Sequence, residues 1–213
     1  MYLSKPHQQQ DLKKIQHLIQ LHPLATVVSF ENGELNANHI PLLWKENDSE
    51  FGILQGHVAR PNSLWQAHDP GIDALAVFTA ADTYISPELS ISKAEDGKVV
   101  PTWSYMVAHA SGPLKIIDDP DWMEQHLTAL TKQHEADRKQ PWTMNDAPRK
   151  FINAMKKGIV GIEIDITQLL GKWKLNQKES QRNKDSISVG LSNSTRQSDM
   201  RLCSFIQSEP EKN

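Results

Sequence analysis

The chain has a single cysteine, Cys203, among its 213 residues. One cysteine excludes an intramolecular disulfide and any zinc site of the CxxC type, and it is typical of proteins in a reducing compartment. No apolar run approaches the ~20 residues that a membrane-spanning helix needs, and the opening MYLSKPHQQQDLKK lacks the apolar segment of a secretion signal. We therefore expect a cytoplasmic protein that is not inserted in a membrane.

The chain has few apolar residues, and its net charge is small. Hydrophobic residues make up 38% of the chain, which is below the roughly 45–50% of an average domain and indicates that part of the chain lies outside a core. The formal net charge is −3. The protein therefore has no general attraction to nucleic acid and would need a local basic patch to bind it.

Four common motifs are absent from the sequence: GxxxxGK[ST], a GxGxxG after a strand, HExxH and GxSxG. Their absence argues against a P-loop nucleotide site, a Rossmann dinucleotide site, a zinc protease and a hydrolase with a nucleophile elbow. A Ser/His/Asp triad dispersed along the chain stays open.

Short segments of β-branched and alternating apolar residues predict strands, and Asn32-Gly33 between two of them predicts a hairpin turn. The predicted strands cover residues 24–30, 35–44, 51–59, 73–80, 102–118 and 159–169. Residues 11–23 have the spacing of an amphipathic helix, with Asp11 as its N-cap. Two more helices are expected at about 119–157, the first beginning at Pro120. The sequence thus predicts a mainly β, α+β fold: an antiparallel β-barrel with peripheral helices.

The composition changes after residue 177. Residues 178–213 are dominated by Ser, Asn, Gln and charge, so we expect a polar, poorly ordered C-terminal tail, in which 202–206 could dock. Residues 1–177 then form the barrel domain, with the helical pair as an insertion.

Three polar segments stand at strand ends: NANHIP (36–41), GHVARPN (56–62) and KVVPTWSY (98–105). A guanidinium gives paired, charge-assisted bonds to phosphate, and neighbouring amides and hydroxyls take the remaining oxygens. Trp103 offers a flat apolar face for a ring system. The set therefore suits a phosphorylated aromatic ligand such as FMN. Its candidate residues are Asn38, His39, His57, Arg60, Asn62, Lys98, Thr102, Trp103 and Tyr105.

Plainer readings of the same residues remain open. The asparagines suit turns, Arg60 suits a solvated loop, and Trp103 and Tyr105 share strand parity and suit a core whose polar tips reach backbone groups. His39, His57 and His109 could instead meet as metal ligands or bind a haem.

Eight motifs in order, from MYL and LNANHIP through GHVARPN, YISP, GKVVPTWSY, VAHASGPLKIIDD and GIVGIEIDITQLLGKWKLNQ to a final GL, resemble the FMN-binding negative transcriptional regulators, the PaiB-like family. The resemblance runs from Met1 to about Leu191. It implies a flavin split β-barrel that forms homodimers and holds FMN between subunits. NANHIP and GHVARPN would take the phosphate and KVVPTWSY the isoalloxazine, while GKWKLNQ would bring Lys172 and Trp173 to the cleft. The family's pattern is broken at Lys178-Glu179 and at Asn183-Lys184.

The resemblance predicts an FMN-binding regulator that acts on transcription, and the residues suggest indirect action. No helix-turn-helix is apparent, because the nine residues QPWTMNDAP separate the two helices, more than the ~3–4 residues of such a turn. The alternatives are a flavin-dependent oxidoreductase, with Tyr105 or His109 as a proton donor, and a haem-binding split-barrel protein. No catalytic residue and no metal site are assigned.

Overall fold

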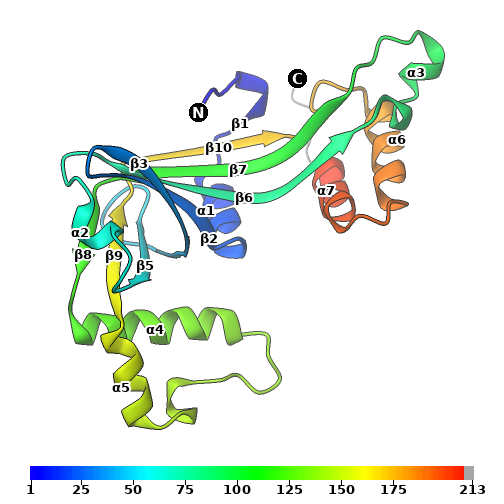
Figure 1. Cartoon of the computed structure of the whole chain (residues 1–213). Coiled ribbons are helices and arrows are strands. Elements are labelled where there is room, and N and C mark those ends of the chain that lie inside the picture. Colours follow the sequence, from blue (N-terminus) through cyan, green and yellow to red (C-terminus); the bar gives the residue numbers. More distant parts are fainter. Residues whose placement is uncertain (209–213) are drawn as a thin grey trace. The chain divides into compact units, whose positions relative to one another are not determined.

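The computed structural model describes residues 1–208, and the last five residues of the expected tail lie outside that description, as do the side chains of residues 204, 207 and 208. The chain forms two compact units (Figure 1). Unit 1 contains Met1–His22, Phe78–His109 and Leu170–Asn213, and unit 2 contains Pro23–Val77 and Ala110–Leu169. No helix in the described part is both long and apolar enough to span a membrane.

Unit 2 begins with the predicted hairpin, formed by β2 (Leu24–Glu31) and β3 (Glu34–Pro41). Asn32 and Gly33 both adopt positive φ, at 52° and 89°, as the tightest right-twisted hairpin turn requires. Strand β2 also pairs with the start of β6 (Ala74–Ile85). Its alternate residues are buried, which explains the period-two pattern of the sequence.

A second, four-stranded antiparallel sheet completes the β structure of unit 2, in the order β4-β5-β9-β8. Its strands are β4 (Leu43–Lys45), β5 (Ile53–Ala59), β9 (Ile159–Asp165) and β8 (Leu114–Ile117). The strand predicted over 159–169 therefore ends early, and β10 begins after a break at residues 166 and 167.

The helices of unit 2 confirm the predicted pair (Figure 1). They are α4 (Pro120–Glu135) and α5 (Arg149–Lys157), joined through η3 (Met144–Asp146), with the short α2 (Leu64–Ala67) after β5. Asp119 caps α4 by accepting from the Trp122 backbone N–H at 2.6 Å. Lysines in the last turn of α5 suit the negative end of that helix.

Unit 1 contains β1 and most of the adjacent strands β10, β7 and β6. Their bounds are β1 (Gln8–Gln9), β10 (Gln168–Lys174) and β7 (Thr102–Gly112), with β6 as given above. Helix α1 (Leu12–Leu21) is capped by the Asp11 side chain, as predicted, and buries Ile15, Leu18 and Ile19. The remaining short helices are η1 (Lys5–His7), η2 (Pro87–Leu89) and α3 (Ser92–Glu95).

The burial pattern of β6 changes phase inside the strand. Ala74, Ala76 and Phe78 are buried, and the pattern then resumes at Ala81 and continues at alternate residues to Ile85. Such a shift is what one extra residue in a strand produces. In the second half of β6, which lies in unit 1, the buried residues are therefore the odd-numbered ones, whereas in the first half they are the even-numbered ones.

The C-terminal segment differs from the poorly ordered tail that composition predicts, since it contains α6 (Gln181–Ser192) and α7 (Gln197–Ser208), which pack side by side (Figure 1). Their few apolar residues are spaced for one buried face each: Ile187 with Leu191, and Leu202 with Ile206. Asp199 of α7 is also buried and accepts hydrogen bonds from Thr83 and Ser194. The C-terminal segment therefore folds because its apolar residues are spaced along one face of each helix, although they are few.

Candidate functional site

The eleven predicted site residues are divided between the units. Unit 2 holds Asn38, His39, His57, Arg60 and Asn62, and unit 1 holds Lys98, Thr102, Trp103, Tyr105, Lys172 and Trp173. The two groups are described in turn, each within its own unit.

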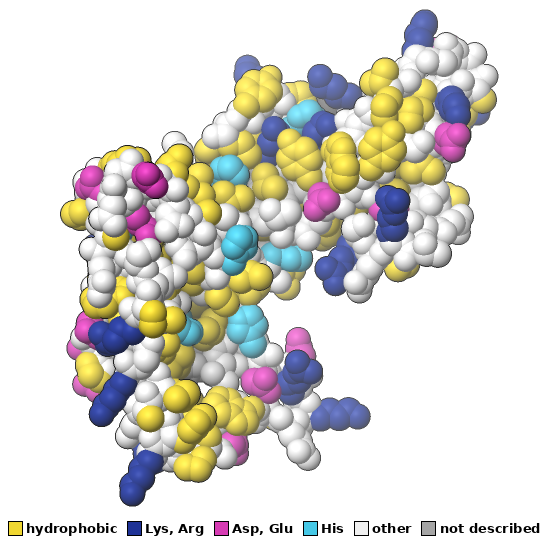
Figure 2. All heavy atoms as spheres, in the orientation of Figure 1, with side chains coloured by type: hydrophobic (Ala, Val, Ile, Leu, Met, Phe, Trp, Pro, Cys, Tyr) yellow, Lys and Arg dark blue, Asp and Glu magenta, His cyan; other side chains and the backbone are white. Residues whose placement is uncertain are grey.

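In unit 1, alternation along β7 and β10 brings aromatic rings and lysines to one face of the sheet. Trp103 and Tyr105 lie on the face of β7 that is not buried, and Lys172 and Lys174 lie on the corresponding face of β10. Both ammonium groups lie over the Tyr105 ring, 5.5 and 5.9 Å from its centroid. Cation–π attraction at this range holds lysines and ring together. We call these four residues the cationic-aromatic face. Figure 2 shows hydrophobic and Lys or Arg side chains interleaved in unit 1.

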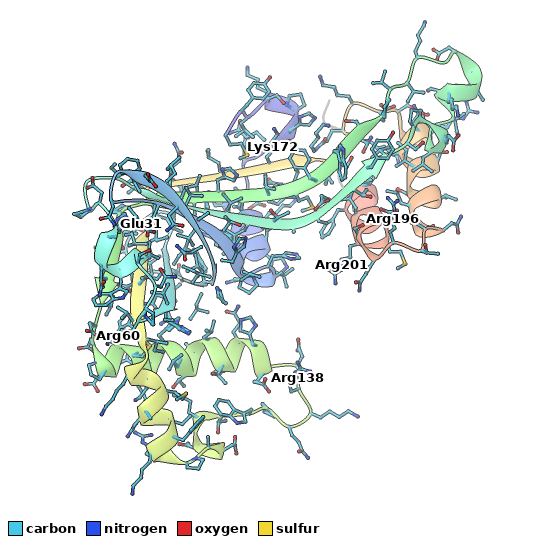
Figure 3. The ribbon with its side chains drawn as sticks, viewed as in Figure 1. Glu31, Arg60, Arg138, Lys172, Arg196 and Arg201 are labelled. Atoms are coloured by element: carbon cyan, nitrogen blue, oxygen red, sulfur yellow. The ribbon has the colours of Figure 1, made fainter. Side chains whose placement is uncertain are left out.

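Three hydrogen bonds and one contact between rings fix this face. Lys174 donates to the Thr102 hydroxyl at 2.6 Å and to the Trp103 carbonyl at 2.7 Å. Lys172, labelled in Figure 3, donates to the backbone carbonyl of Tyr2 at 3.0 Å. Trp103 is 54% exposed and meets the Tyr84 ring edge-on at 6.0 Å. The lysines are therefore positioned before any ligand arrives, and an exposed indole stands beside them.

A pocket of about 280 Å³ adjoins the start of β7. Its basic lining residues are Lys98, Lys174, Lys178 and His7, and its neutral donors include Thr102, Ser104 and Asn176. One carboxylate, Glu179, also lines it. Ammonium groups and hydroxyls around a small cavity are the donors that bind phosphate oxygens. We call it the lysine pocket; sequence reasoning named two of these residues, Lys98 and Thr102, as cofactor ligands and missed Lys174 and Lys178.

Trp173 does not join this group. Alternation along β10 turns it to the other face of the sheet, where it is 5% exposed. His109 follows Tyr105 at the same strand parity and is half-buried. Burial, followed by the charges of the N-terminal amine and Lys172, lowers the pKa of His109. Its imidazole is therefore neutral at pH 7.

In unit 2 the motifs NANHIP and GHVARPN come together through two asparagines. Asn62 donates from its amide to the Asn38 side-chain oxygen at 2.7 Å, and its own oxygen accepts from the Leu64 N–H at 2.9 Å. The Asn38 amide nitrogen is buried and has no hydrogen-bond partner within residues 1–208. His39, one residue along β3, is exposed. The motifs thus meet as predicted and leave one donor free.

Arg60 is bound inside its own unit. Its Nε donates to the Lys157 carbonyl at 2.9 Å, at the end of α5, and its two terminal nitrogens donate to the Asp118 carboxylate at 3.1 and 2.6 Å. The hydrogen bond from Arg60 lowers the pKa of Asp118. The paired donor edge expected to bind phosphate is therefore turned to a carboxylate, and Arg60 secures α5 to the sheet.

A buried polar cluster that sequence reasoning missed surrounds His57. Its Nδ1 lies 3.0 Å from Nε2 of His126 on α4, and Trp122 stacks on the His126 ring at 5.0 Å between centroids. Trp122 donates to Glu163 at 3.4 Å, and Gln55 donates to the same carboxylate at 2.5 Å. Helix α4 therefore docks on the β5–β9 pair through polar side chains.

His126 is 1% exposed. Burial, followed by the charges of His57 and Lys45, lowers its pKa to about 3, and burial also lowers the pKa of His57. Both imidazoles are neutral at pH 7. In the described residues no group of three or more His, Cys, Asp or Glu is arranged to hold a metal ion. The histidine that contacts His57 is His126, and not His39 or His109 as the sequence suggested.

Comparison with known proteins decides the family. A family model described as "Putative FMN-binding domain" matches residues 1–168. The chain belongs to this FMN-binding family. Among its relatives, the protease synthase and sporulation protein PAI 2 of Bacillus subtilis is 26% identical over 212 residues, with 100% of this chain and 99% of that protein covered. An uncharacterized protein of Emericella nidulans is 29% identical over 229 residues, with 91% of each chain covered.

The fold of this FMN-binding family member is also found among solved structures. The FAD and heme binding protein from Mycobacterium smegmatis superimposes with a TM-score of 0.58 at 18% identity, covering 86% of this chain and 80% of that one. Together with the antiparallel sheets and peripheral helices, this confirms the predicted flavin split-barrel fold.

Proposed function

We propose that the protein binds FMN on unit 1, with the isoalloxazine against the cationic-aromatic face and the phosphate in the lysine pocket. The observation that carries the proposal is the convergence of five predicted residues, Lys98, Thr102, Trp103, Tyr105 and Lys172, on that face and the pocket beside it. Lys174 belongs to both, since it lies over Tyr105 and lines the pocket.

The chemistry of the donors fits this ligand. A phosphate monoester carries about −1.5 to −2 charges at pH 7, and three lysines against one glutamate line the pocket. Trp103 and Tyr105 offer π faces to a flat ring, and Lys172 places positive charge beside it. Bound FMN would supply one- or two-electron redox chemistry, while these residues hold and orient it.

We also propose a homodimer in which this face is covered by a second copy. Tyr84 and Trp103 form an exposed aromatic pair in unit 1, with the N-terminal Tyr2 over Lys172. Exposed clusters of aromatic side chains are typical of protein interfaces. A flavin ring between two such faces would be shielded from water.

The test is a fluorescence titration of the full chain with FMN, and with riboflavin as the ligand that lacks phosphate. Lys98→Met and Lys178→Met should each weaken FMN binding by about three- to tenfold, because each removes a charge facing the phosphate, and should leave riboflavin binding unchanged. Lys150→Met, an exposed lysine of α5, is the matched control. Light scattering on the same samples should give the mass of a dimer.

The variant Arg60→Met distinguishes a phosphate bound in the lysine pocket from a phosphate bound by Arg60, which the sequence motif favours. We expect it to lower the melting temperature, because α5 loses its contact, and to leave FMN affinity within about twofold. A tenfold loss of FMN affinity in Arg60→Met, with no loss in the lysine variants, would move the phosphate to Arg60 and contradict the lysine pocket.

A role in transcription is proposed in its indirect form. The net charge of −3 and the long connection between α4 and α5 support action through FMN or a protein partner rather than through reading of bases. A sequence-selective, salt-dependent shift of DNA by the pure protein would contradict this.

A further inference from the structure

A second, apolar pocket lies in unit 1 on the side of the sheet to which Trp173 points. It has a volume of about 190 Å³ and lies between α1, the strands β6, β7 and β10, and α7. Its deep lining residues Leu18, Met106 and Trp173 are each at most 5% exposed. Neither the flavin proposal nor the family match assigns anything to this cavity.

The pocket has the size of a small ring. An apolar cavity of about 150 Å³ holds benzene, so 190 Å³ accepts one ring with a short substituent. A three-ring isoalloxazine exceeds this volume. Phe205 of α7 also lines the pocket and adds a second aromatic ring to its wall, and Leu21, which is 59% exposed, lies where the pocket meets solvent.

The mouth of the pocket is cationic. Lys14, His17, Leu18 and Leu21 follow the spacing of one face of α1, so a lysine and a histidine stand above the apolar lining. His22 also lines the pocket. No carboxylate of the described residues lines it.

Arg201 adds to the same positive field. Burial, followed by the charge of Arg201, lowers the pKa of His22; Figure 3 labels Arg201 on α7. His22 is then a neutral hydrogen-bond donor at pH 7 and lines the same pocket as Lys14. An apolar cavity with such a mouth selects a ligand with an apolar body and one negative end.

The geometry points to a binding site for a small aromatic monocarboxylate, with its ring against Trp173 and Met106 and its carboxylate toward Lys14 and the two histidines. An aromatic ring suits the flat walls of Trp173 and Phe205. A carboxylate suits a lysine ammonium group and imidazole N–H donors at the mouth. This site is separate from the proposed flavin face, because Trp173 and Lys172 alternate to opposite sides of β10.

Benzoate and benzamide are the probes, followed by two-dimensional NMR of the full chain. Benzoate should shift pocket signals saturably and bind at least about fivefold more tightly than benzamide, which has the same ring without the charge. Lys14→Gln should weaken benzoate by about three- to tenfold. Lys13→Gln, the neighbouring exposed lysine that does not line the pocket, should not.

Two cavity-filling variants keep the test decisive. Ala80→Leu occupies the pocket from β6, and Leu21→Trp obstructs it from the exposed side; either one, if folded, should abolish benzoate shifts and leave FMN affinity unchanged. The inference is overturned if benzamide equals benzoate, if Lys13→Gln and Lys14→Gln act alike, or if binding survives a filled pocket. Competition between benzoate and FMN would also overturn it as a separate site. The benzoate shifts themselves do not depend on whether the flavin proposal holds.

Discussion

Acidification is expected to destabilise this protein steeply, with the free energy of unfolding falling by up to about 1.4 kcal/mol per pH unit below pH 6.5 through His126 alone. The folded-state pKa of His126 is lowered to about 3 from 6.5. The unfolded chain therefore binds a proton that the folded chain excludes, so stability is present above pH 6.5 and is lost as the pH falls toward 3. His57, whose pKa burial also lowers, adds to the same slope.

Urea unfolding at several pH values between about 7 and 4 measures this slope. His126→Gln should flatten the acid limb, because a neutral amide replaces the buried titrating ring. His134→Gln, at an exposed position of the same helix, is the matched control and should keep the wild-type slope. An unchanged acid limb in His126→Gln would show that the His57–His126 pair does not control acid stability.

The second large effect is expected at the end of β7, where Gly112→Ala should destabilise the protein by about 3 kcal/mol or more. A Cβ at Gly112 would overlap the backbone carbonyl oxygen of Asp165 and lie 2.9 Å from its carbonyl carbon and 3.1 Å from the Thr167 nitrogen. The crossing is tied by the Thr167 N–H, which donates to the Ser111 carbonyl at 2.9 Å. All of these neighbours are backbone atoms, so no flexible side chain can move away to make room for the added Cβ.

Gly71→Ala provides the comparison. The nearest neighbour of a Cβ at Gly71 is the side-chain oxygen of Asp69 at 3.3 Å, in an exposed turn. A side chain can rotate away, so stability should change by no more than about 1 kcal/mol in either direction. Thermal and urea unfolding measure both variants. Equal effects of the two substitutions would show that the strand crossing at Gly112 is not tightly packed.

Local signals in the sequence predicted much of the fold. Asn32-Gly33 turns as its residue types require, Asp11 caps the helix that it precedes, and α4 begins at Pro120 as expected. These features depend on neighbouring residues only, so a single sequence contains them. The polar segments 36–41 and 56–62 also meet, through Asn38 and Asn62.

The misses depend on contacts between residues far apart in the chain. Helical spacing alone predicts an apolar stripe of Met123, Leu127 and Leu130 on α4. The helix instead buries Met123 and His126, because its partner surface holds His57. Arg60 finds Asp118, 58 residues away. Neither partner could be read from residue type or local spacing. The same holds for α6 and α7, whose few apolar residues are buried where the two helices pack on each other and on neighbouring elements of unit 1.

The phase change in β6 has a consequence for comparing relatives. Two halves of one strand, on either side of residues 79 and 80, bury opposite sets of alternate side chains. An alignment that places here, without a gap, a relative's strand that keeps a single burial phase would match inward positions to outward ones over half its length. Low percentage identity in this segment would then measure a misplaced gap rather than evolutionary distance, and homology would be better judged by aligning each half on its own.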